Sequence, residues 1–171
     1  MNNTITINKN LAGIHFIVIL LCALMLSSCA DKEVSRALSR ADELMWTKPD
    51  SALAVLESVD TLDLKTKAQR ARFSLLYTMA LDRNHIIIQN LHIIEPAVRY
   101  YERHGSKDAK MKMYFYLGVA QYDTGDSESA IVSYIRAKEY SLYSDNLMFK
   151  GLISSVISDI YFNNSSFASE K

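Results

Sequence analysis

The chain has 171 residues, of which 49% are hydrophobic and 22% are charged, and its 19 basic side chains balance its 19 acidic ones. This balance, without a run of Lys and Arg, gives no electrostatic basis for binding nucleic acid. Only 5 Gly and 2 Pro are present, and this scarcity favours long helices over a turn-rich all-β fold. We therefore expect one all-α domain.

Residues 1–28 are predicted to be a targeting segment, because Lys9 precedes an apolar run from Leu11 to Leu26. The run suits a signal-peptide core and is shorter than the roughly 20 residues that a transmembrane helix needs. Leu26-Ser27-Ser28-Cys29 then resembles the lipobox of bacterial lipoproteins, which implies cleavage before Cys29 and lipid, such as palmitate, on that cysteine. An ordinary secretory signal and an uncleaved anchor are the alternatives, and both also export the chain.

A lipid on Cys29 would hold the protein to a membrane while residues 29–171 stay in water. We therefore expect the domain in the cell envelope, at the periplasmic face or at the cell surface. The sequence does not indicate which membrane carries it.

Beyond the targeting segment, the apolar residues recur at helical spacing. A first hairpin is predicted over about residues 31–60, with Pro49 ending its first helix and starting its second. A second hairpin, over about 64–105, is expected to start at an Asp63 cap, with Asn84 as a left-handed terminator of its first helix. His85–Gln89, which is rich in isoleucine, is interpreted as a connection because no second strand exists to pair with it.

Ser106 is predicted to cap the third hairpin, over about residues 108–141. Gly118 and Ala130 are expected where its helices cross, because larger side chains there would push the axes apart. Gly125 then supplies a left-handed turn and Asp126 caps the second helix. The residues expected to build this repeat are Tyr114, Leu117, Gly118, Ala130, Tyr134 and Ala137.

A half-repeat over residues 146–162 follows, in which a first-helix pattern lacks its partner helix. Such a helix would expose an apolar stripe, whereas helical repeats normally end in a polar capping element. We expect either that the chain is the N-terminal portion of a longer protein or that its end docks on a partner.

The spacing Tyr114-x2-Leu117-Gly118, Gly125-Asp126, Ala130-x3-Tyr134-x2-Ala137 resembles the tetratricopeptide repeat (TPR). Together with the lipobox and with residues 49–53 and 96–105, it resembles TPR lipoproteins of Bacteroidetes-type bacteria, including longer sensors or regulators. The resemblance implies a right-handed solenoid of about seven helices in antiparallel hairpins.

By the same resemblance, the first helix of each hairpin lines a concave groove that binds a segment of a protein partner. The implied function is a membrane-anchored scaffold or sensing module. Alternatives are a glycan-binding or uptake accessory lipoprotein and a component of outer-membrane assembly. The groove positions implied are Lys112, Phe115, Val119, Tyr122, Asp123, Ser74, Thr78, Leu81 and Asp82.

No enzymatic activity, metal or cofactor is expected. His85, His92 and His104 are not three or four residues apart, as two metal ligands on one helix face would be. Carboxylate pairs fall beside expected helix ends and turns, where capping and solvation explain them. The sequence also has no Gly-rich phosphate loop and no Gly-x-Ser-x-Gly element.

Overall fold

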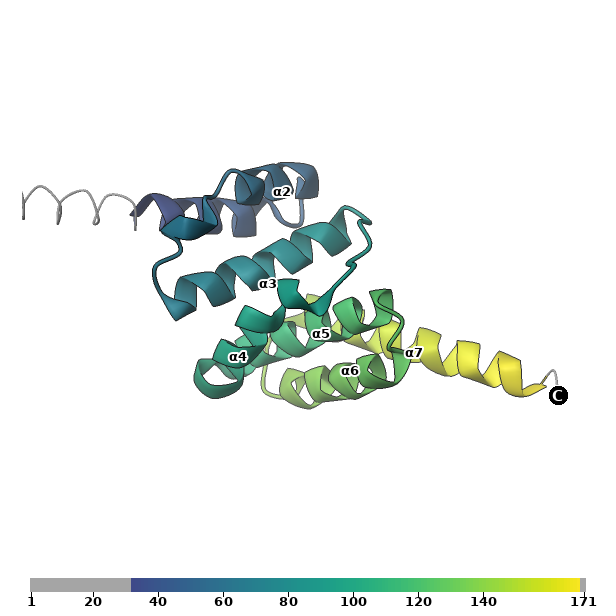
Figure 1. Cartoon of the computed structure of the whole chain (residues 1–171). Helices are drawn as coiled ribbons and strands as arrows, with labels where there is room; N and C mark the ends of the chain where they lie inside the picture. The colour runs from purple at the N-terminus through teal and green to yellow at the C-terminus, as the bar shows by residue number, and fades with distance from the viewer. Residues whose placement is uncertain (1–31, 170–171) are drawn as a thin grey trace, which may run out of the picture.

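The computed structural model describes residues 32–169, and the side chains of residues 32–160 (Figure 1). The expected targeting segment and the expected lipidation site Cys29 lie outside the described residues. Within residues 32–169 the chain folds into seven α-helices and two short 3₁₀ helices, without a strand. The prediction of an all-α fold with about seven helices is confirmed.

The helices follow one another with short connections. They are a helix over residues 32–44, α2 (Pro49–Glu57), the 3₁₀ helix η1 (Thr61–Asp63), α3 (Lys67–Arg83), the 3₁₀ helix η2 (Leu91–Ile93), α4 (Glu95–His104), α5 (Lys107–Asp123), α6 (Ser127–Ser141) and α7 (Leu147–Ser169). The most extensive contact is between α5 and α6, followed by that between α3 and α4. This pairing of neighbouring helices is consistent with a helical repeat.

Local sequence signals set several helix starts, and those at Pro49 and Ser106 are as predicted. Pro49 and Pro96 lie in the first turns of α2 and α4, where a missing N–H costs nothing. The Ser106 hydroxyl accepts a hydrogen bond from the Ala109 N–H at 3.2 Å and caps α5. These starts are therefore encoded within a few residues of each helix.

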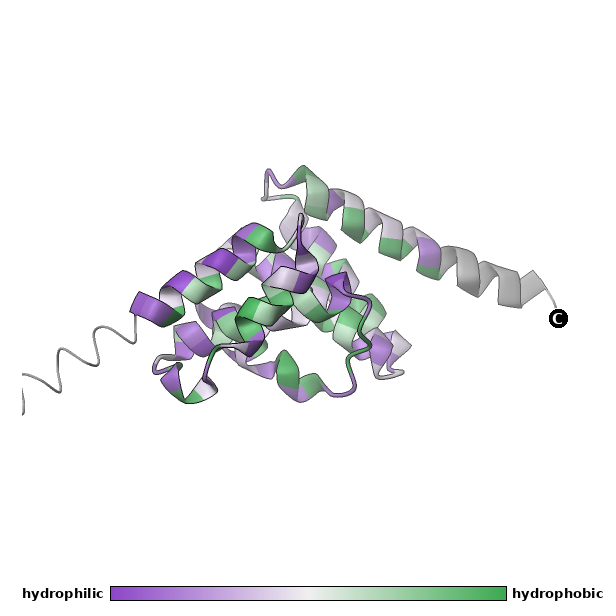
Figure 2. Cartoon of the chain, turned by 90° about the horizontal axis from the view of Figure 1, so that it is seen from above, coloured by the Kyte–Doolittle hydropathy of each residue, from purple (hydrophilic) through white to green (hydrophobic). Residues whose placement is uncertain are grey.

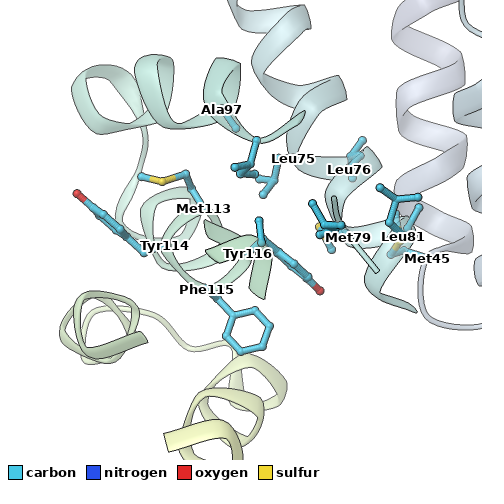
Figure 3. Packing of buried hydrophobic residues seen from close by; sticks show 14 of the residues in the cluster. Met45, Leu75, Leu76, Met79, Leu81, Ala97, Met113, Tyr114, Phe115 and Tyr116 are labelled. Atoms are coloured by element: carbon cyan, nitrogen blue, oxygen red, sulfur yellow. The ribbon is translucent and has the colours of Figure 1, made fainter. Parts of the chain in front are cut away.

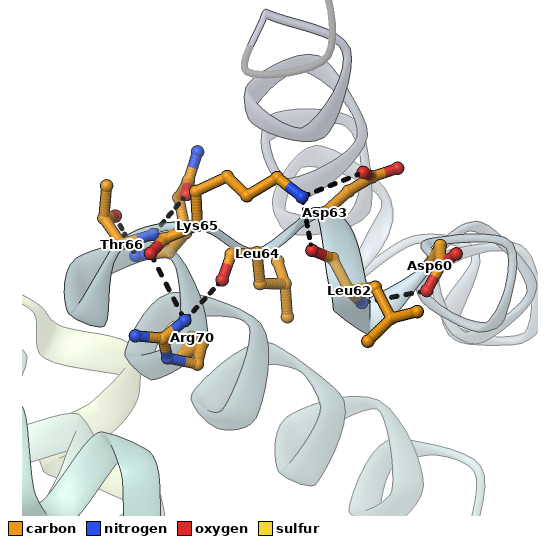
Figure 4. Close-up of polar contacts among 8 residues, drawn as sticks. Asp60, Leu62, Asp63, Leu64, Lys65, Thr66 and Arg70 are labelled. Carbon is orange, nitrogen blue, oxygen red and sulfur yellow. Dashed lines mark hydrogen bonds and ion pairs between the residues drawn. The ribbon is translucent and has the colours of Figure 1, made fainter. Parts of the chain in front are cut away.

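The start of α3 differs from the prediction, because Asp63 does not cap it. Asp60 instead caps η1, and Asp63 forms an ion pair with Lys65 at 3.5 Å (Figure 4). The cap of α3 is Thr66, whose hydroxyl accepts a hydrogen bond from the Gln69 N–H at 3.1 Å. The Gln69 side chain accepts one in return from the Thr66 N–H at 2.9 Å, which completes a capping box.

The end of α3 also differs in one detail. Asn84 is not left-handed, with φ of −95°, and the positive φ of 56° falls on His85. The Asn84 amide donates hydrogen bonds to the carbonyl oxygens of Ala80 at 2.7 Å and Pro49 at 2.9 Å, which links α3 to α2. The run that follows is a connection without strand structure, as predicted, and its Ile88 is buried.

The α5–α6 hairpin shows why its small residues are needed. A Cβ atom placed on Gly118 would lie 2.6 Å from Cε1 of Tyr134, so the tyrosine ring occupies the space that a side chain would take. Ala130 and Ala137 are fully buried on α6. Gly125, with φ of +87°, makes the turn, and the Asp126 carboxylate accepts a hydrogen bond from the Ser129 N–H at 3.0 Å. The other two predicted repeat residues differ in burial, Tyr114 being buried and Leu117 half-buried.

The hydrophobic core runs through all the hairpins. Figure 2 shows hydrophobic and hydrophilic residues alternating along the helices, as expected for amphipathic helices. In Figure 3, Tyr116 of α5 points toward Leu76 and Met79 of α3, whereas Phe115 points in another direction, toward α7. The side of α5 that faces α7 is therefore covered.

Helix α7 is longer than the predicted half-repeat and extends beyond the other helices (Figure 1). Asn146 caps it by accepting a hydrogen bond from the Phe149 N–H at 3.1 Å. Phe149 and Ile153 are buried against the rest of the domain, while Leu147 is 77% exposed. No helix between residues 32 and 169 has the length and apolar character that crossing a bilayer requires.

Candidate functional site

Four of the nine predicted groove residues are buried: Ser74, Thr78, Leu81 and Phe115. The Ser74 hydroxyl donates a hydrogen bond to the carbonyl oxygen of Ile93, since η2 lies against α3. The Thr78 hydroxyl donates to the Ser74 carbonyl oxygen at 2.9 Å. These residues do not line an open groove, and this part of the predicted site is wrong.

Phe115 is covered from two sides. Its ring centroid is 5.8 Å from that of Phe149 of α7 and 5.7 Å from that of Tyr134 of α6. The prediction assumed that first helices lie side by side with an open face, whereas α7 places an aromatic ring on that face of α5. Phe115 therefore packs the core.

The other predicted groove residues remain accessible to different degrees. Tyr122 is 54% exposed at the end of α5, while Lys112, Val119, Asp82 and Asp123 are half-buried. The carboxylate of Asp123 accepts a hydrogen bond from the Ile88 N–H at 2.9 Å, which ties the α3–η2 connection to α5.

A cavity of about 200 Å³ lies between the first helix, α3, α5 and α7, and we call it the inner-face cavity. Its walls come from the 32–44 helix and the turn after it, from α3, α4, α5 and α7, and from the connections at Ser106 and Asn146. The residues that line it include Asp42, Trp46, Arg72, Met79, Lys112 and Phe149. Lys112 is the one predicted groove residue that lines it.

The apolar part of the cavity centres on two aromatic rings. Trp46 and Phe149 meet edge to face, with ring centroids 5.8 Å apart and planes at 90°. The Arg83 guanidinium lies 4.8 Å from the Trp46 ring, and the Lys112 ammonium lies 5.5 Å from the Phe149 ring. Both cations are within the range of cation–π attraction.

Two ion pairs flank these rings. Arg72 pairs with Asp42 at 3.7 Å, and Lys112 pairs with Asp108 at 3.0 Å. Asp108 also accepts a hydrogen bond from the Ser144 hydroxyl at 2.8 Å, which connects α5 to the turn before α7. The cavity thus presents an apolar floor with charges of both signs at its edge.

Several interacting polar side chains lie near the ends of α3 and α5. Burial raises the pKa of Asp82, and the negative charge of Asp123 adds to this effect while Arg83 opposes it. Burial also raises the pKa of the Tyr116 phenol, and the Asp82 charge raises it further. The Tyr116 hydroxyl has no hydrogen-bond partner among the described residues.

The third hairpin has a second, wider hollow of about 410 Å³. It is lined by α5 and α6 alone, through Tyr114, Val132, Ile135, Arg136, Glu139 and Tyr140. The inner-face cavity, in contrast, brings together residues from hairpins far apart in the sequence. We favour the inner-face cavity as the candidate site because only the complete fold assembles it.

Sequence reasoning missed Trp46, Arg72 and Phe149 as site residues. Phe149 lies within the predicted half-repeat 146–162, but its contact with Trp46 depends on where α7 crosses the domain. No local pattern carries that information. Within the described residues, no group of three or more His, Cys, Asp and Glu side chains is arranged to hold a metal ion.

Comparisons with protein-family models, with curated protein sequences and with solved structures find no match to this chain.

Proposed function

We propose that this chain is a lipid-anchored, non-catalytic protein-binding module of the TPR type, and that its inner-face cavity holds a segment of another protein. The observation that supports this most is the composition of the cavity. It combines an aromatic floor, Trp46 and Phe149, with the ion pairs Asp42–Arg72 and Asp108–Lys112 at its edge.

Such a surface suits a peptide segment. Apolar pockets with a few well-placed polar groups take a side chain and fix its orientation. The flanking charges of both signs would select a segment with complementary charges. At about 200 Å³, the cavity accommodates one or two side chains of a segment that continues along the inner face.

The membrane anchor rests on the sequence. Leu26-Ser27-Ser28-Cys29 supplies the lipobox pattern, and the 32–44 helix begins three positions after Cys29. A lipid at Cys29 would therefore keep the domain close to the bilayer. The intact mass of the chain purified from membranes tests this part, because lipidation and cleavage change the mass together.

Charge reversal tests the binding part. Arg72→Glu and Asp42→Arg each replace one partner of an ion pair at the cavity. Arg99→Glu is the matched control, because Arg99 is 77% exposed on α4, pairs with Glu95 and does not line the cavity. The three variants and the unchanged chain are purified with their bound proteins from native membranes, and each captured protein is then titrated in purified form.

The proposal predicts one protein that binds the unchanged chain and Arg99→Glu saturably and is lost from both cavity variants. Identical capture by all four chains would contradict the cavity as the site. Saturable binding of an oligosaccharide by calorimetry, lost in Arg72→Glu and kept in Arg99→Glu, would favour the glycan-binding alternative.

A further inference from the structure

Large hydrophobic side chains are exposed in the turn between α6 and α7 and at the first residue of α7. Leu142 is 75% exposed, Tyr143 is 71% exposed and Leu147 is 77% exposed. Soluble domains expose single apolar residues routinely, but neighbouring ones gathered in one turn mark a contact surface. We call these three residues the apolar turn.

The apolar turn lies at one end of the lower helices. In Figure 1, the start of the 32–44 helix and η1 lie at the left of the upper helices, and the α4–α5 and α6–α7 turns lie at the left of the lower helices. The residue Leu62 of η1 is also strongly exposed, at 79%. Exposed apolar residues therefore lie at the left of both the upper and the lower helices.

Cationic side chains surround the aromatic part of this end. The Lys107 ammonium lies 5.1 Å from the Tyr143 ring and 5.4 Å from the Tyr140 ring. The Lys110 ammonium lies 5.8 Å from the Tyr140 ring. Asp145 in the same turn is exposed and offsets part of this positive charge.

Leucine and tyrosine side chains beside lysines suit a bilayer surface better than a protein pocket. Tyrosine places its ring among acyl chains and its hydroxyl among headgroups, while lysine reaches anionic headgroups with its ammonium. A basic side chain near an anionic membrane surface is attracted to it.

We propose that the apolar turn, with Lys107 and Lys110, rests on the surface of a bilayer that contains anionic phospholipid. This membrane contact agrees with the proposed lipid on Cys29, and the inference partly rests on that lipid. The three peptide steps from Cys29 to residue 32 span at most about 11 Å when extended, so the lipid holds this end of the domain at the membrane. The domain then has two membrane contacts, a covalent lipid and an apolar turn.

Single cysteines test the contact in the full chain. Leu142→Cys and Leu147→Cys place a polarity-sensitive fluorophore in the apolar turn. Ile87→Cys is the matched control, because Ile87 is 68% exposed in the connection after α3, at the other end of that helix. The unchanged chain gives the background from Cys22 and Cys29. Each chain is reconstituted into vesicles of neutral phospholipid with and without anionic phospholipid, some carrying spin-labelled acyl chains.

The proposal predicts blue-shifted emission at positions 142 and 147, quenching by the spin-labelled lipid and a stronger effect with anionic lipid. The fluorophore at position 87 stays in water. Emission at 142 and 147 as polar as at 87 would overturn the proposal. Polar emission in vesicles but protection in native membranes would also overturn it and indicate a protein contact. The intact mass reports lipid on Cys29 separately, so failure of the anchor and failure of the turn are distinguishable.

Discussion

Phe149 at the start of α7 meets Trp46, which follows the first helix, with ring centroids 5.8 Å apart and planes at 90°. Phe149 also contacts the rings of Phe115 and Tyr116 in the middle of α5. Helical repeats ordinarily contact only their nearest neighbours. This one side chain therefore joins the beginning, the middle and the end of the domain.

Removing that ring should destabilise the whole domain. Phe149 is 1% exposed, so we expect Phe149→Ala to lower the free energy of unfolding by about 3–5 kcal/mol. Leu147→Ala is the control, because its side chain is 77% exposed, and its effect should stay within about 0.5 kcal/mol. Urea denaturation followed by circular dichroism measures both. Equal effects would mean that α7 does not pack on the domain as described.

Alanine substitutions at two glycines separate the effect of crowding on stability from the effect of helix propensity. Gly118→Ala places a Cβ 2.6 Å from the buried Tyr134 ring, and such overpacking costs about 1–3 kcal/mol. Gly151 of α7 has open space around the same position, so Gly151→Ala should stabilise by about 0.5–1 kcal/mol through helix propensity alone. Thermal melting of the two variants checks the opposite signs. A stabilising Gly118→Ala would contradict the close crossing of α5 and α6.

The contrast between these sites shows what the sequence predicts and what it does not. Gly118, Gly125 and Asp126 act within one hairpin, and their roles follow from spacing alone. The burial of Ser74 depends on η2, and the burial of Phe115 depends on α7. The burial of these two residues depends on elements distant from them in the sequence, so a repeat pattern could not predict it.

The cap of α3, in contrast, could have been predicted from the sequence. Asp63 and Thr66 can each cap a helix, but only Thr66 has a Gln three positions later, which is the pattern of a capping box. The structure uses Thr66 because Gln69 stands three positions later and completes a reciprocal pair. The contact between the site residues Trp46 and Phe149 could not be predicted from the sequence, because it joins the two ends of the domain.

Tyr116 and Tyr114 form a pair for testing hydroxyl groups. The Tyr116 hydroxyl has no hydrogen-bond partner among the described residues, so Tyr116→Phe should leave stability unchanged or raise it by up to about 1 kcal/mol. The Tyr114 hydroxyl donates to Glu102 at 3.2 Å and accepts from Arg136 at 3.0 Å. Tyr114→Phe should therefore cost about 0.5–1.5 kcal/mol. Chemical denaturation decides, and a larger loss for Tyr116→Phe would contradict the assigned contacts.

The carboxyl of Asp82 should make stability depend on pH. Burial raises the pKa of Asp82 in the folded state above the ordinary value of 3.8. The folded state therefore ionises less readily than the unfolded state, and stability falls as the pH rises above 3.8. Asp82→Asn removes this cost and should raise the melting temperature at neutral pH. The gain should shrink as the pH falls through the folded-state pKa and vanish below the ordinary value. A gain independent of pH would contradict burial of the charge as its cause.

Site-specific photocrosslinking tests the central proposal, capture of a protein on the inner face, most directly. A benzophenone amino acid replaces Met148, which is 43% exposed at the inner-face cavity and takes no part in its ion pairs, or Val132, which is 54% exposed on α6 and lines the other hollow. After irradiation of native membranes, we predict one protein adduct at position 148 that position 132 does not give. No adduct at position 148, or the same adduct at both positions, would contradict binding at the inner face.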